Sequence, residues 1–201
     1  MPVPAINLHN AINAPAFAGA LRFLIAIAMN IVDQRYLSGS NRYCSEPCLL
    51  SILELDHSPT EDELHTLKAG LARALPGLRR GRSLIGVIGD DADDRSTSLR
   101  LARLVQSVAI ELHRLTGDDV MVGFVGRVPR ADNRYRLILP FRSGEVANAA
   151  LALALDLVSA ILAGQELDLQ AGISQLQAIA SRSKPRATND ATADDAIRIA
   201  A

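Results

Sequence analysis

A long run of alanine and leucine in the C-terminal half constrains the fold of this chain more than any other feature. Residues 145–162 predict a helix that is apolar on nearly all sides. A helix with so little polar surface is stable in a globular protein only where other elements cover it. We therefore expect this helix to be buried, with the remaining helices and strands arranged around it.

Four short apolar runs have the length and the bounding residues that are typical of strands. They lie at residues 48–55, 84–88, 120–128 and 135–141. The last two runs flank the polar turn 129–133, which predicts a hairpin with a long loop.

Three further segments predict helices. The first begins after Thr60, because Glu63 three residues later completes a capping box, and it ends near Leu75. The last spans about residues 168–181. The clearest helix lies between them and ends at Gly117, and its apolar residues recur at helical spacing: Leu101, Leu104, Val105, Val108, Leu112 and Leu115.

Together these elements predict an α/β (α+β) fold. We expect a single domain with a small mixed or antiparallel sheet of about four to five strands, packed by three to four helices. Residues 1–35 are expected to form an N-terminal extension with an apolar helix. The polar stretch from Ser183 to Asp195 is typical of a linker.

Composition excludes several classes of function. Apolar residues make up 49% of the chain, enough for a sizeable core, whereas aromatic residues make up 3% and Trp is absent. The formal net charge is −1, so bulk electrostatics favour neither a nucleic acid nor an anionic membrane as partner. The two cysteines, Cys44 and Cys48, are interpreted as reduced thiols in a cytoplasmic protein.

The apolar segment from Ala14 to Val32 is nearly long enough to span a bilayer. Arg22 interrupts it and Asn30 lies near its end, and no basic region precedes it. A helix packed on the domain, or an extension, is the favoured interpretation, and membrane binding is not expected. A weak membrane anchor is the alternative.

Common catalytic and cofactor motifs are absent. Gly86 and Gly89 follow strand-like residues but lack the third glycine of a dinucleotide fingerprint and the Gly-Lys-Ser/Thr of a P-loop. The four histidines form no ligand pair at helical spacing. The acidic turn from Asp90 to Asp94 lacks calcium-loop spacing, and its charges suit the N-terminus of the following helix. No cofactor or metal is expected.

The central helix carries a polar strip. Arg103, Ser107 and Glu111 are successive i, i+4 neighbours, and Gln106 and Arg114 lie beside them. A solvated helix face with an Arg/Glu pair is the simplest interpretation. A binding surface, or an enzyme site around Arg103, Ser107 and Glu111, are the alternatives.

The segment from Leu101 to Val120 resembles the N-terminal domain of cyanophycin synthetases. In that family a helix of the form His-x-x-Glu-His-Val-Ala-Leu-Glu-Leu-Gln precedes a strand entering Gly-Phe-Gly, and here residues 108–112 and 123–126 are similar. Residues 133–141 resemble the next family strand, and 157–161 the Leu-Val-x-x-Ile end of its buried helix. Upstream, residues 36–41 and 53–55 are similar to the first two family strands. The resemblance covers about residues 36–182.

The resemblance also assigns a zinc-peptidase motif to three positions of the central helix. In some members two histidines with a glutamate between them cleave the polymer into primers. Those positions are Arg103, Gln106 and Ser107 in this sequence. A guanidinium does not ligate zinc, and an amide is no general base. Peptidase activity is therefore expected to be absent.

The resemblance implies that the domain binds the polymer that the family produces. Cyanophycin has a polyaspartate backbone with arginine on its side chains, so that each unit presents a carboxylate and a guanidinium. A surface of both charges suits such a polymer. The candidate polymer-binding residues have this mixed character: Arg79, Arg80, Arg82, Arg103, Ser107, Glu111 and Arg114.

Three hypotheses follow from these observations. The first is a non-catalytic domain that tethers polymer or scaffolds a ligase, with residues 183–201 leading toward a missing ATP-grasp domain. ATP and magnesium would then belong only to ligase domains outside this chain. Its expected partners are cyanophycin, those ligase domains or a second copy of the chain. The second hypothesis is a free-standing partner of a full-length synthetase, and the third is an enzyme with an unrecognised site.

Overall fold

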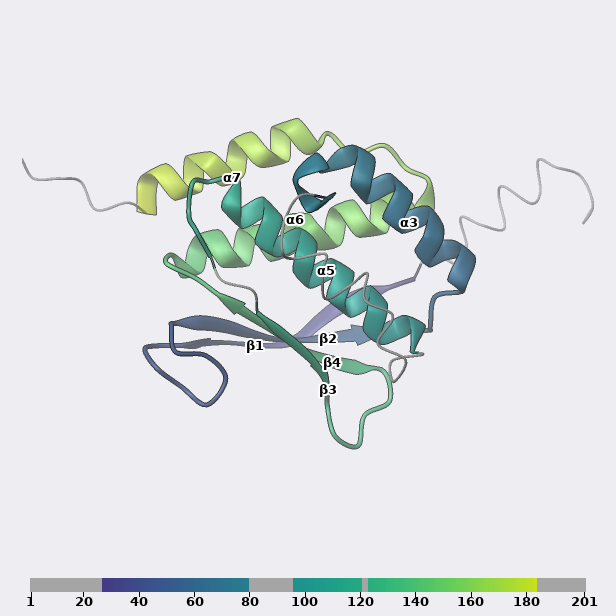
Figure 1. The fold of residues 1–201 in the computed structure, drawn as a ribbon, viewed down its shortest axis with the longest axis horizontal. Helices are drawn as coiled ribbons and strands as arrows, with labels where there is room; N and C mark the ends of the chain where they lie inside the picture. Colours follow the sequence, from purple (N-terminus) through teal and green to yellow (C-terminus); the bar gives the residue numbers. More distant parts are fainter. Residues whose placement is uncertain (1–26, 80–95, 121–122, 184–201) are drawn as a thin grey trace, which may run out of the picture.

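The computed structural model describes residues 27–79, 96–120 and 123–183, which build a sheet covered by helices on one face (Figure 1). Four antiparallel strands lie in the order β1–β2–β4–β3: β1 (Met29–Leu37), β2 (Cys48–Leu55), β4 (Arg134–Pro140) and β3 (Phe124–Arg127). The helices are α3 (Glu61–Ala74), α5 (Thr97–Arg114), α6 (Gly144–Ala163) and α7 (Leu169–Ser183), with the short 3₁₀ helix η1 (Pro76–Arg79). The predicted fold class, one domain with a small sheet and a helical layer, is confirmed.

The helices form two layers above the sheet (Figure 1). Helix α5 packs on β3 and β4, and α6 packs on β1 and β2, while the two helices also pack against each other. Helices α3 and α7 lie above them, since both pack on α6. The inner face of the sheet is therefore the face that α5 and α6 cover.

Helix α6 has the central position that its composition predicts. Its buried residues are mainly small or branched: Val146, Ala147, Ala150, Leu151, Ala154, Leu157, Val158 and Ala160. By length and apolar composition alone, α6 could also cross a membrane. In this fold its apolar surface instead packs against the sheet, α3, α5 and α7.

Strand β1 corrects the expected N-terminal boundary. Residues 29–35, assigned above to an extension with an apolar helix, belong to a strand that pairs with β2 along its length. The pairing register shifts between Ile31 and Asp33, so that Ile31 lies opposite Leu53 and Asp33 lies opposite Ile52. A bulge of this kind turns the following residues to the other face of the sheet. The earlier part of the predicted extension lies outside the described residues.

The remaining predicted elements agree with the structure in outline. Helix α3 begins with a complete capping box between Thr60 and Glu63. The predicted strand at 120–128 is shorter, because β3 spans only Phe124–Arg127. The predicted strand at 84–88 and the acidic turn from Asp90 to Asp94 lie outside the described residues.

Apolar residues are distributed unequally over the two faces of the sheet. The inner face carries the main core, to which β2 and β4 contribute Leu49, Leu53, Leu55, Tyr135, Leu137 and Leu139. The outer face carries only a small cluster of Cys48, Leu50 and Ile138, with Leu37, Tyr43, Cys44 and Ile52 packed against it. The loop between β1 and β2 therefore covers part of a face that no described helix covers.

Candidate functional site

The middle of the polar strip of α5 is buried, and only the two arginines at its ends are partly exposed. Ser107 is 4% exposed, Gln106 is 6% exposed and Glu111 is 9% exposed. Arg103 and Arg114 are half-buried. The expectation of a solvated face is wrong because α5 packs on the sheet and η1 packs on α5, with Gly77 against Glu111.

Gln106 joins α5 to strands β3 and β4 through two hydrogen bonds. Its Nε2 donates hydrogen bonds to the carbonyl oxygen of Phe124 at 3.0 Å and to that of Ile138 at 2.7 Å. These two residues are opposite each other in the β3–β4 register. Gly123 leaves room for this arrangement, because a Cβ at that position would lie 1.7 Å from the Ile138 oxygen. Gln106 therefore has a structural role.

Glu111 and Arg114 form the other end of the strip. Arg114 Nη1 lies 4.0 Å from Glu111 Oε2, and Arg114 Nη2 donates to the Val120 carbonyl at 3.1 Å. The Glu111 carboxylate also lies against η1, where a Cβ at Gly77 would come within 1.8 Å of Glu111 Oε1. Close packing against backbone makes Glu111 a poor contact for a polymer at the surface.

His113 is the most deeply buried titratable side chain near the strip. It is 2% exposed, and its Nε2 lies 3.4 Å from Asp118 Oδ2. Burial lowers the pKa of His113, and the neighbouring Asp118 carboxylate opposes this effect only in part. His113 is therefore a neutral core residue at physiological pH.

The other candidate residues are less fully described. Arg79 ends η1, and its side chain lies outside the described residues, as do Arg80 and Arg82. The structure thus brings Arg103, Ser107, Glu111 and Arg114 together on α5.

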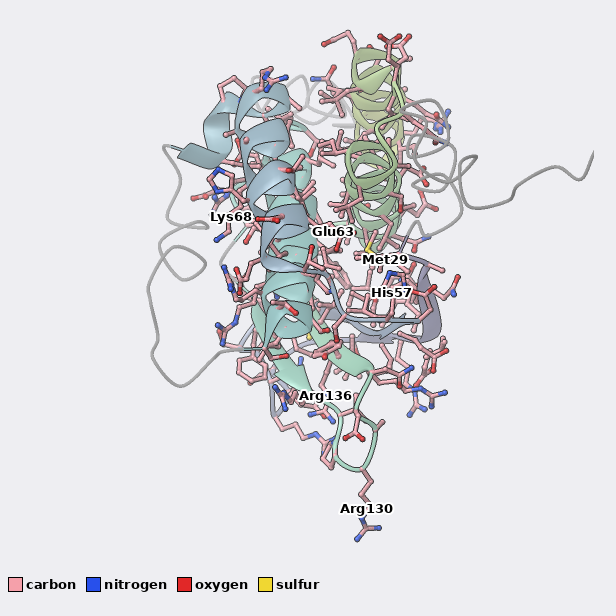
Figure 2. All side chains as sticks on the ribbon, turned by 90° about the vertical axis from the view of Figure 1, so that its right-hand side faces the viewer. Met29, His57, Glu63, Lys68, Arg130 and Arg136 are labelled. Atoms are coloured by element: carbon pink, nitrogen blue, oxygen red, sulfur yellow. The ribbon has the colours of Figure 1, made fainter. Side chains whose placement is uncertain are left out.

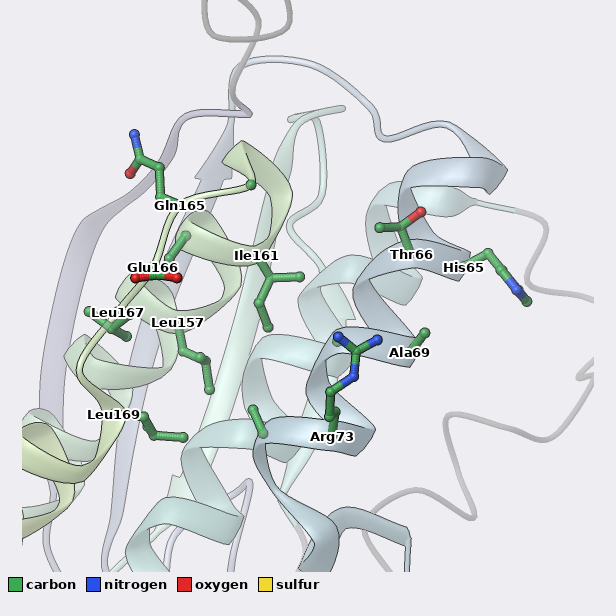
Figure 3. Close-up of a pocket in the computed structure, with 14 residues that line it drawn as sticks. His65, Thr66, Ala69, Arg73, Leu157, Ile161, Gln165, Glu166, Leu167 and Leu169 are labelled. Carbon is green, nitrogen blue, oxygen red and sulfur yellow. The ribbon is translucent and has the colours of Figure 1, made fainter. Parts of the chain in front are cut away.

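Two depressions in the described surface offer room for a ligand. The larger lies between α3 and the α6–α7 connection and has a volume of about 740 Å³ (Figure 3). Leu157 and Ile161 form its floor, with Arg73 and Glu166 on opposite sides. It is wide open, and no described ion pair joins Arg73 to Glu166.

The smaller depression, here called the outer-face groove, has a volume of about 340 Å³. It lies on the sheet face opposite the helices and combines apolar floor residues with several cations. Its lining residues are Asp33, Arg35, Leu37, Asn41, Arg42, Tyr43, Leu50, Ile52 and Arg136. Sequence reasoning missed this groove, although the alternation of Arg134 and Arg136 with buried Tyr135 and Leu137 indicates that both arginines share the outer face.

Comparison with known families connects this architecture to a described domain. The model of the cyanophycin synthase-like N-terminal domain matches residues 49–163, from β2 to the end of α6. This match covers more than half of the chain. The chain belongs to this family. No curated protein matches the sequence.

Membership of the cyanophycin synthase-like family raises the question of a zinc site on α5. The three positions that the resemblance assigns to the motif hold a guanidinium, an amide and a hydroxyl, in Arg103, Gln106 and Ser107. Zinc in proteins is held by imidazole, thiolate or carboxylate groups. Moreover, the Gln106 amide is already committed to two strand carbonyls. These residues do not fit a zinc ion.

The rest of the described chain offers no replacement site. Within residues 27–79, 96–120 and 123–183, no three His, Cys, Asp or Glu side chains are placed to hold a metal ion together. The cysteines Cys44 and Cys48 are not joined by a disulfide. Burial raises the pKa of the Cys48 thiol, while a hydrogen bond with Asn41 opposes this effect. Cys48 is thus a protonated residue of the outer cluster.

Proposed function

We propose that this chain is a non-catalytic member of the cyanophycin synthase-like N-terminal domain family that binds cyanophycin and tethers it for ligase domains. The observation that carries the non-catalytic part is the bond pattern of Gln106. At the position that the resemblance assigns to the catalytic glutamate, an amide donates to two strand carbonyls. A glutamate carboxylate has no hydrogen to donate there, so the amide suits a structural role.

The polymer-binding part rests on surface chemistry. Each cyanophycin unit presents a carboxylate and a guanidinium, and the outer face of the sheet presents both signs of charge. Arg134 Nε lies 2.7 Å from Glu54 Oε1, and Arg35 Nη2 lies 3.0 Å from Asp33 Oδ2. Exposed ion pairs of this kind contribute little to stability, so exchange with a zwitterionic ligand costs the protein little.

Co-sedimentation with insoluble cyanophycin tests the tethering function. The purified chain is mixed with the polymer at about 20 mM and about 200 mM salt, and chitin at the same mass serves as an uncharged control. We expect pelleting with cyanophycin that weakens as salt screens the charges. Recovery in the supernatant at both salt concentrations would contradict tethering, and would favour a scaffold that contacts ligase domains or a full-length synthetase.

A cleavage assay tests the non-catalytic part independently. The chain is incubated with cyanophycin and added zinc, and soluble arginine-containing fragments are measured. We expect no release above the level of buffer with zinc alone. Release that a chelator abolishes would contradict the proposal and would favour an enzyme site near Arg103, Ser107 and Glu111.

A further inference from the structure

The β1 bulge builds one side of the outer-face groove. Because the register shifts between Ile31 and Asp33, the later residues Asp33, Arg35 and Leu37 line the groove rather than the core. Without the extra residue, the period of two would turn them toward α6. The bulge therefore places a carboxylate and a guanidinium at the edge of the outer face.

Two arginines on the other side of the groove meet at one aromatic ring. The guanidinium carbon of Arg42 lies 4.6 Å from the centroid of the Tyr43 ring, and that of Arg136 lies 5.4 Å from it. Arg42 Nη2 also donates to the Tyr43 hydroxyl. Stacking on an aromatic face holds a guanidinium in position but leaves its edge N–H groups available for an acceptor.

Neither of these two arginines has a carboxylate partner in the described part of the chain. The ion pairs of the outer face join Arg35 to Asp33 and Arg134 to Glu54, and none includes Arg42 or Arg136. Arg136 is half-buried, so its charge has lost part of its hydration. A partly dehydrated guanidinium without an acceptor attracts a carboxylate from a ligand.

Because of the strand register, Asp33 and Arg136, which carry opposite charges, lie on either side of the apolar residue Ile52. Asp33 is opposite Ile52 in the β1–β2 pairing, and Ile52 is opposite Arg136 in the β2–β4 pairing. The three residues thus form one row across the sheet. Adjacent strands lie about 4.8 Å apart, so the row places Asp33 and Arg136 about 10 Å apart with Ile52 between them.

We infer that the outer-face groove binds the arginine side-chain units of the polymer, an inference that rests on the proposed function. The carboxylate of one unit accepts hydrogen bonds from Arg42 and Arg136, its aliphatic stem covers Ile52, and its guanidinium replaces Arg35 as the partner of Asp33 in an exposed ion pair. The ligand class is therefore an arginine with an unblocked carboxylate. A purely anionic or purely cationic polymer satisfies only one end of the row.

An NMR titration with a soluble oligomer of the aspartyl-arginine repeat tests this assignment. We expect the largest changes in amide shift at residues 42–43 and 136. The same oligomer with its arginine carboxylates amidated should bind about tenfold more weakly, because it cannot accept charged hydrogen bonds. Shift changes confined to other surfaces, or equal binding of the amidated oligomer, would overturn the inference.

Substitutions distinguish binding in the groove from non-specific electrostatic attraction to the protein. Arg136→Gln and Arg42→Gln should each weaken oligomer binding about tenfold. Arg130→Gln is the matched control, since Arg130 lies at the exposed tip of the β3–β4 hairpin (Figure 2), is not among the residues that line the groove, and its substitution removes the same charge. Dispersed amide spectra for all three variants establish that each is folded. Equal weakening in all three would overturn the inference.

The co-sedimentation assay keeps failure of the groove distinct from failure of the proposed function. If the wild-type chain pellets with cyanophycin and the Arg136→Gln and Arg42→Gln variants pellet equally well, the groove assignment is overturned while tethering stands. If the wild-type chain neither pellets nor binds the oligomer, both fail. If a single-stranded oligonucleotide displaces the oligomer at equal concentration, the groove takes phosphate rather than an arginine unit, and the inference is overturned.

Discussion

On the inner face of the sheet, Leu53, Tyr135 and Leu137 are fully buried beneath helices, whereas on the outer face their neighbours Ile52, Arg134 and Arg136 lie at or near the surface. Polar groups follow the same division. On the inner side, Gln106 donates to two carbonyl oxygens, while on the outer side Arg42 and Arg136 have no carboxylate partner among the described residues.

The two faces therefore differ in their capacity to bind a ligand. Buried polar groups on the inner side are already satisfied by protein partners, so they hold the fold together. Charges on the outer side are held by stacking and by the loop, and they can still accept a ligand. The positions that the resemblance assigns to the zinc motif lie on the inner side of the sheet, whereas the groove lies on the outer side.

The largest expected effect compares two adjacent residues of β2 that point to opposite faces. Leu53→Ala should lower the free energy of unfolding by about 3–4 kcal/mol, because it leaves a cavity in the main core. Ile52→Ala, on the half-buried outer face, should cost about 1 kcal/mol. Urea unfolding of both variants measures the difference. Equal losses would mean that the small apolar cluster on the outer face is a second core, and would contradict the difference between the two faces.

The next effect concerns the amide that joins α5 to the sheet. Gln106→Ala leaves the Phe124 and Ile138 carbonyls without this donor and should lower the free energy of unfolding by about 2 kcal/mol. The control is Gln177→Ala, since Gln177 makes a similar bond to the Leu115 carbonyl at 3.1 Å in an exposed setting. Its loss should cost less than about 0.5 kcal/mol. An equal decrease in the melting temperature of both variants would refute a special role for Gln106.

Gln106→Glu tests the same structural role through the pH dependence of stability. A carboxylate facing two carbonyl oxygens is repelled in its charged form, so its pKa in the folded state should lie above its unfolded value. This variant should be least stable at neutral pH and should recover stability as pH falls and the carboxyl group protonates. Melting temperatures relative to wild type at pH 7.5 and 5.5 measure the recovery. A growing deficit at pH 5.5 would contradict it.

A smaller effect of pH comes from His113. Because burial lowers its pKa below the ordinary value of 6.5, the unfolded chain binds a proton at a higher pH than the folded chain. Stability should therefore fall as pH drops below about 6.5, by no more than about 1.4 kcal/mol per pH unit. Comparing urea unfolding of wild type and His113→Gln at pH 7.5 and 5.5 isolates this contribution. Equal pH dependence in the two proteins would exclude it.

The smallest expected effect is on the outer face. Arg136→Gln should change the free energy of unfolding by less than about 0.5 kcal/mol, because its guanidinium only stacks on Tyr43. Arg134→Gln, which breaks the exposed pair with Glu54, should cost up to about 1 kcal/mol. Urea unfolding of both variants measures these values. A loss above about 2 kcal/mol for Arg136→Gln would make Arg136 structural and would weaken its assignment to a ligand.

Local patterns predicted most of the helices and two strands well. The capping box at Thr60 and Glu63 identified the start of α3, because both groups lie within one turn. The position of β1 could not be predicted in the same way. Its first residues continue an apolar segment that resembles a helix, and only the pairing of Met29 to Leu37 with β2 makes it a strand.

The candidate site was harder to predict than the fold. Helical spacing correctly put Arg103, Ser107 and Glu111 on one strip of α5. Spacing alone cannot tell whether such a strip faces water or packs against η1 and β3, since burial depends on elements that are distant in sequence.

The fold class, the family and the absence of imidazole and carboxylate groups at the zinc-motif positions could be predicted from the amino-acid sequence, because periodicity, caps and residue identity are local properties. Which polar residues are buried and which are available depends instead on how distant segments pack. Arg42, Tyr43 and Arg136 meet because β2 pairs with β4 and the β1–β2 loop folds over the outer face. Asp33 joins them because a single bulge reverses the face of β1. Long-range strand pairing, rather than any local preference, thus assembles the groove.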